Sequence, residues 1–336
     1  MRDIAIRGVT LSRAGDKEQF RWLVQWLAHI VQRPHKLAGT AVALRGPQGS
    51  GKTLVGEVMG AIIGDRLYAK VSRPEELTGR FNAHHDGRLL LQVEEGFWAG
   101  DKKAEGVLKD MITSPTRRIE RKFMDPIELP NLGRLFITSN NAWVIPAGLG
   151  ERRFAMFDVS GDRANDLEYF RALRDQMFEE GGCAKLHHYL LHEVVIDWDL
   201  IKRPPPTRAL LDQQLESLDP EDRWLYDLLA EGTLPHPGAD PSFATTDTLY
   251  HSYCEFLRGT RGRPKSKARF AQWLGDRLGN AVTPARPREN GSRVRGYQFV
   301  SLAECRAQFA QRLTLAPSWA EPVEWEANDA LAWCRT

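Results

Sequence analysis

The 336-residue sequence has no long hydrophobic run. No stretch approaches the roughly 20 apolar residues that a transmembrane helix requires, and the first 15 residues lack the hydrophobic core of a signal peptide. Cysteine is scarce too, since the four cysteines are scattered without a CxxC pair. This pattern argues against a disulfide framework or a zinc ribbon and favours reduced thiols. We therefore expect a cytoplasmic protein with no membrane partner.

The composition is that of a globular protein, with 42% hydrophobic and 27% charged residues, and the length suits about two domains. The net charge of +2 averages over unequal segments. Residues 258–295 contain eleven basic and two acidic residues, a balance of +9. Such a segment favours a polyanionic partner.

Short apolar runs alternate with helical stretches in the first 200 residues, which predicts an α/β fold with a parallel sheet and helices on both faces. The runs expected to be strands are residues 41–44, 67–71, 89–93, 135–138 and 154–159. Three prolines interrupt the pattern, so we expect a domain boundary at residues 203–207. Beyond it we expect helices at residues 207–217, 221–231, 246–257 and 267–279, and a hairpin at 288–300 turned at 290–291.

A glycine-rich loop lies between the first expected strand and a helix over residues 52–63. It matches the pattern GxxxxGK[ST]. Backbone N–H groups in such a loop surround a triphosphate, Lys52 reaches the outer phosphates and the Thr53 hydroxyl binds Mg²⁺. The predicted nucleotide-binding residues are Gly46, Pro47, Gln48, Gly49, Ser50, Gly51, Lys52 and Thr53.

The expected strand at residues 89–93 ends in two carboxylates. Glu94 would bind Mg²⁺ together with Thr53, and Glu95 would act as the general base that polarises the attacking water. The alternative is a solvated acidic strand end.

Two further polar groups end or begin strands. Asn140 follows the strand at 135–138 and is a candidate to orient the attacking water, although an asparagine here also suits a turn. Arg152 and Arg153 precede the strand at 154–159 and are candidates to reach a nucleotide on a neighbouring subunit. The alternative for these arginines is a solvated pair.

Two short alternating runs between residues 117 and 130 predict a hairpin with its tip at residues 122–126. Lys122 would contact the phosphates of one DNA strand and Phe123 would stack on a base. An edge hairpin with protective lysines is the alternative.

In this order the motifs resemble the superfamily 3 helicases of the AAA+ class, in particular the helicase half of phage and plasmid primase-helicases. The stretches that carry the resemblance are GPQGSGKT at 46–53, LLLQVEE at 89–95, RRIERK at 117–122, LFITSNN at 135–141 and GERRF at 150–154. The likeness runs from about residue 20 to residue 200 and continues to residue 229.

The resemblance implies a P-loop AAA+ fold and a homo-hexameric ring in the cytoplasm of a bacterial host. The ring would hydrolyse ATP with Mg²⁺ and draw single-stranded DNA through its centre at a fork. It assigns catalytic roles to Lys52, Glu95, Asn140, Arg152 and Arg153, and makes Lys122 the hairpin lysine. Two features depart from the family pattern. Glu94 stands where aspartate is commoner, and the primase or polymerase domain that relatives often carry upstream is missing, so we expect a separate primase or polymerase, or a chain that is a fragment.

We expect an N-terminal helical segment (1–35), a P-loop ATPase core (36–202), a proline-rich linker (203–207), a smaller, mainly helical basic domain that resembles a winged helix (208–302) and a C-terminal tail (303–336). In the basic domain a helix and a wing would present cations to a duplex. The candidate DNA contacts are Arg263, Lys265, Lys267, Arg288, Arg293 and Arg295, and a solvated basic face is the alternative.

The leading hypothesis is an ATP-dependent DNA helicase of a phage, plasmid or other mobile element. Its main rival is an ATP-dependent DNA-binding initiator or switch that does not unwind DNA. A winged-helix regulator with a vestigial ATPase is less favoured, because Lys52 and both acids are present.

Overall fold

The computed structural model describes residues 17–73, 76–77, 79, 82, 85–95, 102–235, 240–260, 262–289, 292–319 and 321–326, with only the backbone at 102–104 and 289. The first 16 residues, the turn expected at 290–291 and the last ten residues lie outside this set. The chain divides into two compact units. Unit 1 takes the chain up to residue 147 together with residues 151–217, and unit 2 takes residues 148–150 and the chain from residue 218.

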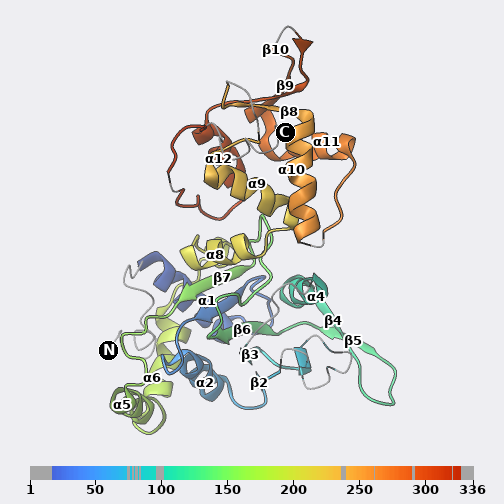
Figure 1. Cartoon of the computed structure of the whole chain (residues 1–336). Coiled ribbons are helices and arrows are strands. Elements are labelled where there is room, and N and C mark those ends of the chain that lie inside the picture. Colours follow the sequence, from blue (N-terminus) through green and yellow to red (C-terminus); the bar gives the residue numbers. More distant parts are fainter. Residues whose placement is uncertain are drawn as a thin grey trace. The chain divides into compact units, whose positions relative to one another are not determined.

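Unit 1 is built on a five-stranded parallel sheet in the order β2-β3-β6-β1-β7 (Figure 1). Its elements are α1 (Lys17–Gln32), β1 (Ala41–Arg45), α2 (Lys52–Ile63), β2 (Tyr68–Val71), β3 (Leu90–Glu94), α4 (Lys102–Thr113), β4 (Thr116–Ile119), β5 (Ile127–Pro130), β6 (Arg134–Ser139), β7 (Phe154–Asp158), α5 (Leu167–Phe178), α6 (Gly182–His188), the π-helix η2 (Tyr189–Glu193), α7 (Trp198–Ile201) and α8 (Arg208–Glu216). The expected mixed α/β fold with a parallel sheet is confirmed.

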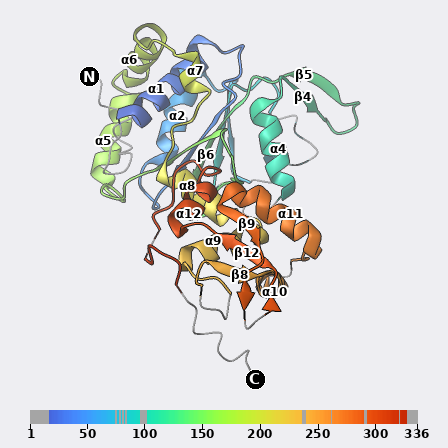
Figure 2. The same cartoon turned by 90° about the horizontal axis from the view of Figure 1, so that it is seen from above.

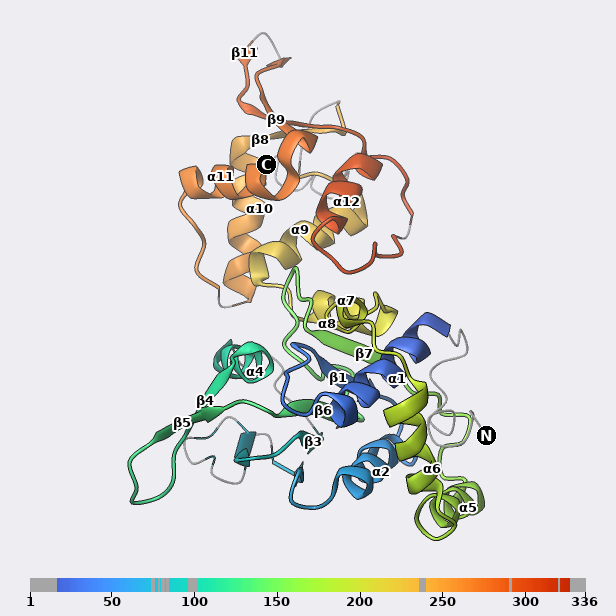
Figure 3. The same cartoon turned by 180° about the vertical axis from the view of Figure 1, so that it is seen from behind.

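Both faces of the sheet are covered, which explains why its strands are apolar throughout. Alternate strand residues such as Val42 and Phe136 pack with α1 and α2, whereas Ala43 and Ile137 pack with α4 and α8. Figure 2 shows α1 and α2 on one side of the sheet and α4 on the other. The strands β4 and β5 form an antiparallel hairpin that extends away from the sheet (Figures 1 and 3).

The helix α8 packs within unit 1, so the division of the chain falls after Ser217 rather than at residues 203–207. Thr207 begins this helix: its hydroxyl accepts a hydrogen bond from Leu210 N and donates one to Met156 O of β7 at 2.6 Å. An N-cap of this kind typically contributes about 1 kcal/mol to stability. The proline-rich segment therefore leads into another helix of the same core.

In the described part of unit 2, four longer helices combine with a small antiparallel sheet in the order β8-β12-β9. Its elements are α9 (Pro220–Glu231), β8 (Phe243–Thr245), α10 (Thr246–Gly259), α11 (Lys267–Leu278), the 3₁₀ turn η3 (Gly279–Ala281), β9 (Val282–Ala285), β10 (Arg288–Glu289), β11 (Ser292–Arg293), β12 (Gly296–Phe299) and α12 (Leu302–Ala310). The β10–β11 pair projects from the unit (Figure 3).

Residues 303–319 and 321–326 belong to unit 2 and pack into it rather than forming a separate tail. Cys305 and Phe309 of α12 are fully buried in its core. Further on, Trp325 Nε1 donates to Val300 O at 2.8 Å and its ring lies 5.6 Å from that of Phe299. The segment therefore completes the hydrophobic core of the unit.

Candidate functional site

The loop of residues 46–51 joins β1 to α2 at the carboxyl edge of the parallel sheet, where open α/β sheets bind ligands. Gly49 and Gly51 have φ angles of 75° and 82°, which favour glycine. A Cβ atom on Gly51 would lie 2.4 Å from a ring carbon of Phe170, and one on Gly49 would lie 2.3 Å from Asn165 Oδ1. The segment around α5 thus fits closely against the loop, and both positions require glycine.

The Lys52 amine is held within this loop. Nζ donates to the carbonyl oxygens of Gly46 and Pro47 at 2.8 and 2.7 Å, and to Asn140 Oδ1 at 2.9 Å. Only 7% of Lys52 is exposed, and this burial lowers the pKa of its amine while the charge of Glu95 opposes the shift. The amine is already directed towards the strand ends that carry the polar residues.

Asn140 connects Lys52 to the second carboxylate. Its Nδ2 donates to Glu95 Oε1 at 2.7 Å, while its Oδ1 accepts from Lys52. Glu95 follows β3 with a φ of 52°, a strained conformation for a residue other than glycine. The structure therefore joins the predicted phosphate-binding lysine, amide and general base in one hydrogen-bonded chain.

Glu94 lies at the end of β3 and pairs with Lys70 of β2 at 2.8 Å. Burial lowers the pKa of the Lys70 amine, but the hydrogen bond and charge of Glu94, with those of Glu57, outweigh it, so the net pKa is raised. Neither Lys70 nor Glu57 was singled out from the sequence. Lys70 lies in an edge strand and Glu57 in a helix, and no local sequence pattern indicates that these two side chains are in contact.

A pocket of about 430 Å³ collects most of the predicted nucleotide site. Its lining includes Gln48, Gly49, Ser50, Gly51, Lys52, Thr53, Glu94, Glu95 and Asn140, joined by Glu57, Asn165, Leu167, Phe170 and Arg174. Thr53 and Glu94 both contribute oxygen atoms, the ligand type that Mg²⁺ prefers. The donor set of this pocket thus fits a magnesium ion bound through one hydroxyl and one carboxylate.

Arg152 and Arg153 lie elsewhere in unit 1. They immediately precede β7, at the amino edge of the sheet, opposite to the edge that carries the loop. The buried carboxylate of Glu151 organises this segment, because its Oε1 accepts from the backbone N–H groups of both arginines at 2.8 and 2.6 Å. Arg153 also pairs with Glu151 at 3.5 Å, whereas Arg152 is exposed.

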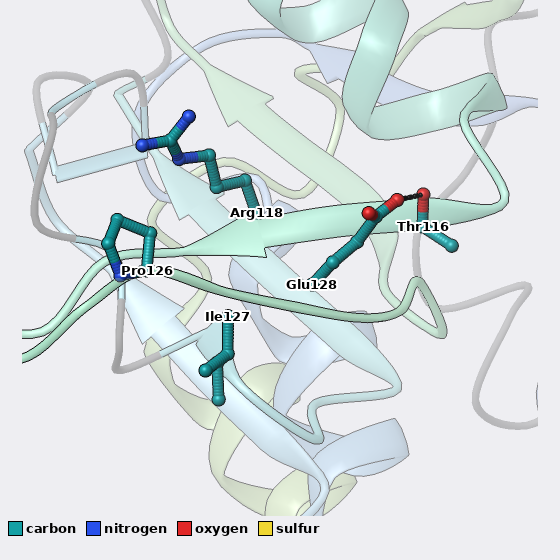
Figure 4. Close-up of a pocket in the computed structure, with 5 residues that line it drawn as sticks. All are labelled: Thr116, Arg118, Pro126, Ile127 and Glu128. Carbon is teal, nitrogen blue, oxygen red and sulfur yellow. Dashed lines mark hydrogen bonds between the residues drawn. The ribbon is translucent and has the colours of Figure 1, made fainter.

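The hairpin predicted before β6 is present, with Lys122 and Phe123 at its tip. Phe123 is fully exposed and has a φ of 62°. A separate hollow of about 550 Å³ lies along the hairpin, lined by Thr116, Arg118, Pro126, Ile127 and Glu128. Figure 4 shows the Thr116 hydroxyl bonded to Glu128, with Ile127 pointing away from Arg118 across the ribbon. None of these five residues lines the pocket at residues 48–54, so the two hollows are separate.

The six predicted DNA contacts of unit 2 fall into two groups. Lys265 pairs with Glu221, and Lys267 pairs with Asp247, so acids of the same unit neutralise these lysines. Arg263, Arg288, Arg293 and Arg295 have exposed side chains. The charge pattern of the sequence does not separate paired from unpaired cations, because Glu221 and Asp247 lie 44 and 20 positions from Lys265 and Lys267.

A family model described only as a family of unknown function (DUF5906) matches residues 44–153. The DNA primase-polymerase of Nitratiruptor phage NrS-1 is 26% identical over 149 residues, which cover 43% of this chain and 20% of that protein. The match thus spans about one fifth of the length of this curated relative.

Two solved structures of the C-terminal region of NrS-1, both without ligand, have TM-scores of 0.65 and 0.63. They are 16% identical in sequence to this chain. The likenesses cover 89% and 88% of this chain, and 76% and 74% of those chains. At this identity they establish a likeness of fold alone.

These findings contradict the prediction of an ATP-hydrolysing DNA helicase. The relative found by sequence is named a DNA primase-polymerase, and the similar structures are of the NrS-1 C-terminal region. The assignment to the AAA+ helicases is therefore not supported. The rival prediction of an ATP-dependent initiator or switch is contradicted by the same findings. The expected relationship to phage replication proteins is supported.

Proposed function

We propose that this chain is a nucleotide- and DNA-binding part of a phage-type replication protein related to the primase-polymerases. The loop of residues 46–53 binds the phosphates of a nucleoside triphosphate, and Thr53 with Glu94 binds Mg²⁺. The relative found by sequence is named a DNA primase-polymerase. The proposal assigns to this chain the binding of nucleotide and the binding of DNA.

The observation that carries the proposal is the hydrogen-bonded chain Lys52–Asn140–Glu95 within one pocket. A buried ammonium next to backbone N–H groups at the start of α2 is an anion-binding arrangement. Burial strengthens its attraction to phosphate, because the effective dielectric constant there is lower than in water. Magnesium would neutralise further phosphate charge from the side of Thr53 and Glu94.

Unit 2 is the candidate duplex-binding part, with a fold like that of a winged helix. The order α9-β8-α10-α11-β9-β12, the antiparallel sheet and the projecting β10–β11 hairpin support this assignment. In such folds a helix and a wing contact DNA. The exposed Arg263, Arg288, Arg293 and Arg295 are the proposed contacts, and Lys122 and Phe123 of unit 1 are the proposed contacts for single-stranded DNA.

Titration of fluorescent ribo- and deoxyribonucleoside triphosphates into the full chain, with and without Mg²⁺, tests the nucleotide site. We expect saturable binding that requires Lys52, so that Lys52→Ala weakens it by at least tenfold. Lys185→Ala, which removes an exposed lysine of α6, should bind as the unmodified protein does. Equal binding by Lys52→Ala, or no binding of any triphosphate by the unmodified protein, would overturn the assignment.

A further inference from the structure

Four charged side chains of alternating sign form a row beside the nucleotide pocket. Arg174 of α5 pairs with Glu57 Oε2 at 2.8 Å. Lys70 Nζ lies 3.4 Å from Glu57 Oε1 and 2.8 Å from Glu94 Oε1. One ammonium is therefore shared between two carboxylates, and the nearer of these is the proposed magnesium ligand.

The backbone explains why these side chains meet. Lys70 lies opposite Gln92 in the parallel register of β2 and β3, so its long side chain has to span only two residues to reach Glu94. Glu57 follows Thr53 by four residues in α2, which places both on the same helical face. Thr53, Glu57, Glu94 and Arg174 all line the pocket.

We infer that Lys70 is a positioning residue that holds the Glu94 carboxylate when Mg²⁺ is absent and competes with Mg²⁺ for it. The inference rests on the proposed nucleotide site and adds a means of regulating it. Magnesium binding at Glu94 releases the Lys70 ammonium, which stays paired with Glu57. Glu57 therefore sets how readily Lys70 leaves Glu94.

The charges of the row determine the direction of each effect. Removing the Lys70 charge leaves Glu94 with its full negative charge for Mg²⁺, so less Mg²⁺ should be needed. Removing the Glu57 charge takes away the alternative partner of Lys70, so Lys70 should bind Glu94 more firmly and more Mg²⁺ should be needed. Loss of packing or of folding would not move the magnesium requirement in opposite directions.

The test is the Mg²⁺ concentration that gives half-maximal binding of a fluorescent nucleoside triphosphate to the full chain. Lys70→Met should lower this concentration about two- to fivefold, the range expected for one partly exposed ion pair. Glu57→Gln should raise it by a similar factor. In the double variant Lys70→Met/Glu57→Gln, the change at Glu57 should have little further effect, because its influence acts through Lys70.

Lys70→Gln serves as a second variant in case the methionine disturbs the edge strand, and Lys185→Met serves as a charge-matched control. An unchanged Mg²⁺ requirement in both Lys70 variants would overturn the inference, as would a shift of Lys70→Met and Glu57→Gln in the same direction. If the unmodified protein bound no nucleotide at any Mg²⁺ concentration, the proposed function itself would fail. The two failures are thus distinguishable.

Discussion

Gln92 lies so close to Gly56 that a Cβ atom on the glycine would stand 1.8 Å from Gln92 Oε1. Gln92 is fully buried in the centre of β3, where the sequence has an otherwise apolar run. Its Oε1 accepts from the Tyr68 hydroxyl at 2.7 Å, and its Nε2 donates to Thr53 O at 3.2 Å. The amide thus joins β2, β3 and the first turn of α2, directly after the loop of residues 46–51.

This contact predicts the effect of adding a single methyl group to α2. Gly56→Ala should lower the free energy of unfolding by about 1–3 kcal/mol, because the new atom would displace a buried, hydrogen-bonded amide. Gly106→Ala in α4 is the matched control, since a Cβ atom there would have no atom of the described residues within 4 Å. That helical change should raise stability by about 0.5–1 kcal/mol. Urea unfolding measures both, and equal effects would refute the packing argument.

The sequence predicted the elements of the sheet and placed most of the residues that line the pocket together as one candidate site, because hydrophobic periodicity and the GxxxxGK[ST] pattern are local signals. It did not predict Gln92, which looks misplaced in a buried strand until Tyr68 and Thr53 supply its partners. Nor did it reveal Glu151, whose Oε1 accepts from two backbone N–H groups. Polar residues whose role depends on distant or backbone partners carry no periodic pattern.

Because of His29, we expect unit 1 to lose stability as the pH falls. Burial, followed by the charge of Arg134, lowers its pKa to about 3. Its Nδ1 lies 3.4 Å from the Arg134 guanidinium, which also donates to the backbone carbonyls of Arg33 and Leu132. The folded state therefore holds a neutral imidazole beside a fixed cation.

The unfolded chain binds the His29 proton with an ordinary pKa near 6.5, well above the folded value. The stability that neutral His29 contributes is thus complete above pH 6.5 and is lost as the pH falls towards 3. The free energy of unfolding should fall by up to about 1.4 kcal/mol per pH unit in this window. His29→Gln should flatten that slope, whereas His251→Gln, at an exposed position, should not. An identical slope in His29→Gln would contradict the assignment.

We expect Phe123 to contact single-stranded DNA without contributing to the stability of the folded protein. Its side chain is fully exposed at the tip of the β4–β5 hairpin, so Phe123→Ala should leave the free energy of unfolding nearly unchanged. If the ring stacks on a base, the same change should weaken binding of a labelled oligonucleotide by about 1–3 kcal/mol. Val195→Ala removes another exposed apolar side chain of unit 1 and should do neither. Unchanged affinity in Phe123→Ala would assign the hairpin another role.

The β10–β11 hairpin brings two arginines together without an evident structural benefit. Arg288 and Arg293 are directly opposite in its antiparallel register, and both are exposed. Like charges in this position destabilise a strand pair by a few tenths of a kcal/mol or more. A bound phosphate backbone would turn this repulsion into attraction, which makes the hairpin a stronger candidate for duplex contact than the paired Lys265 and Lys267.

Salt dependence separates the two groups of cations. Each phosphate contact contributes about 0.9 to the slope of log affinity against log salt concentration. Arg288→Ala and Arg293→Ala should therefore each reduce the slope for duplex DNA by about that amount, as measured by fluorescence anisotropy at several salt concentrations. Lys265→Ala and Lys267→Ala should leave the slope unchanged, because Glu221 and Asp247 already neutralise these lysines. Lys265→Ala should instead lower stability, since it leaves the largely buried Glu221 carboxylate without its cation. The opposite result, with slopes reduced only by the lysine variants, would move the duplex contact from the hairpin to the start of α11.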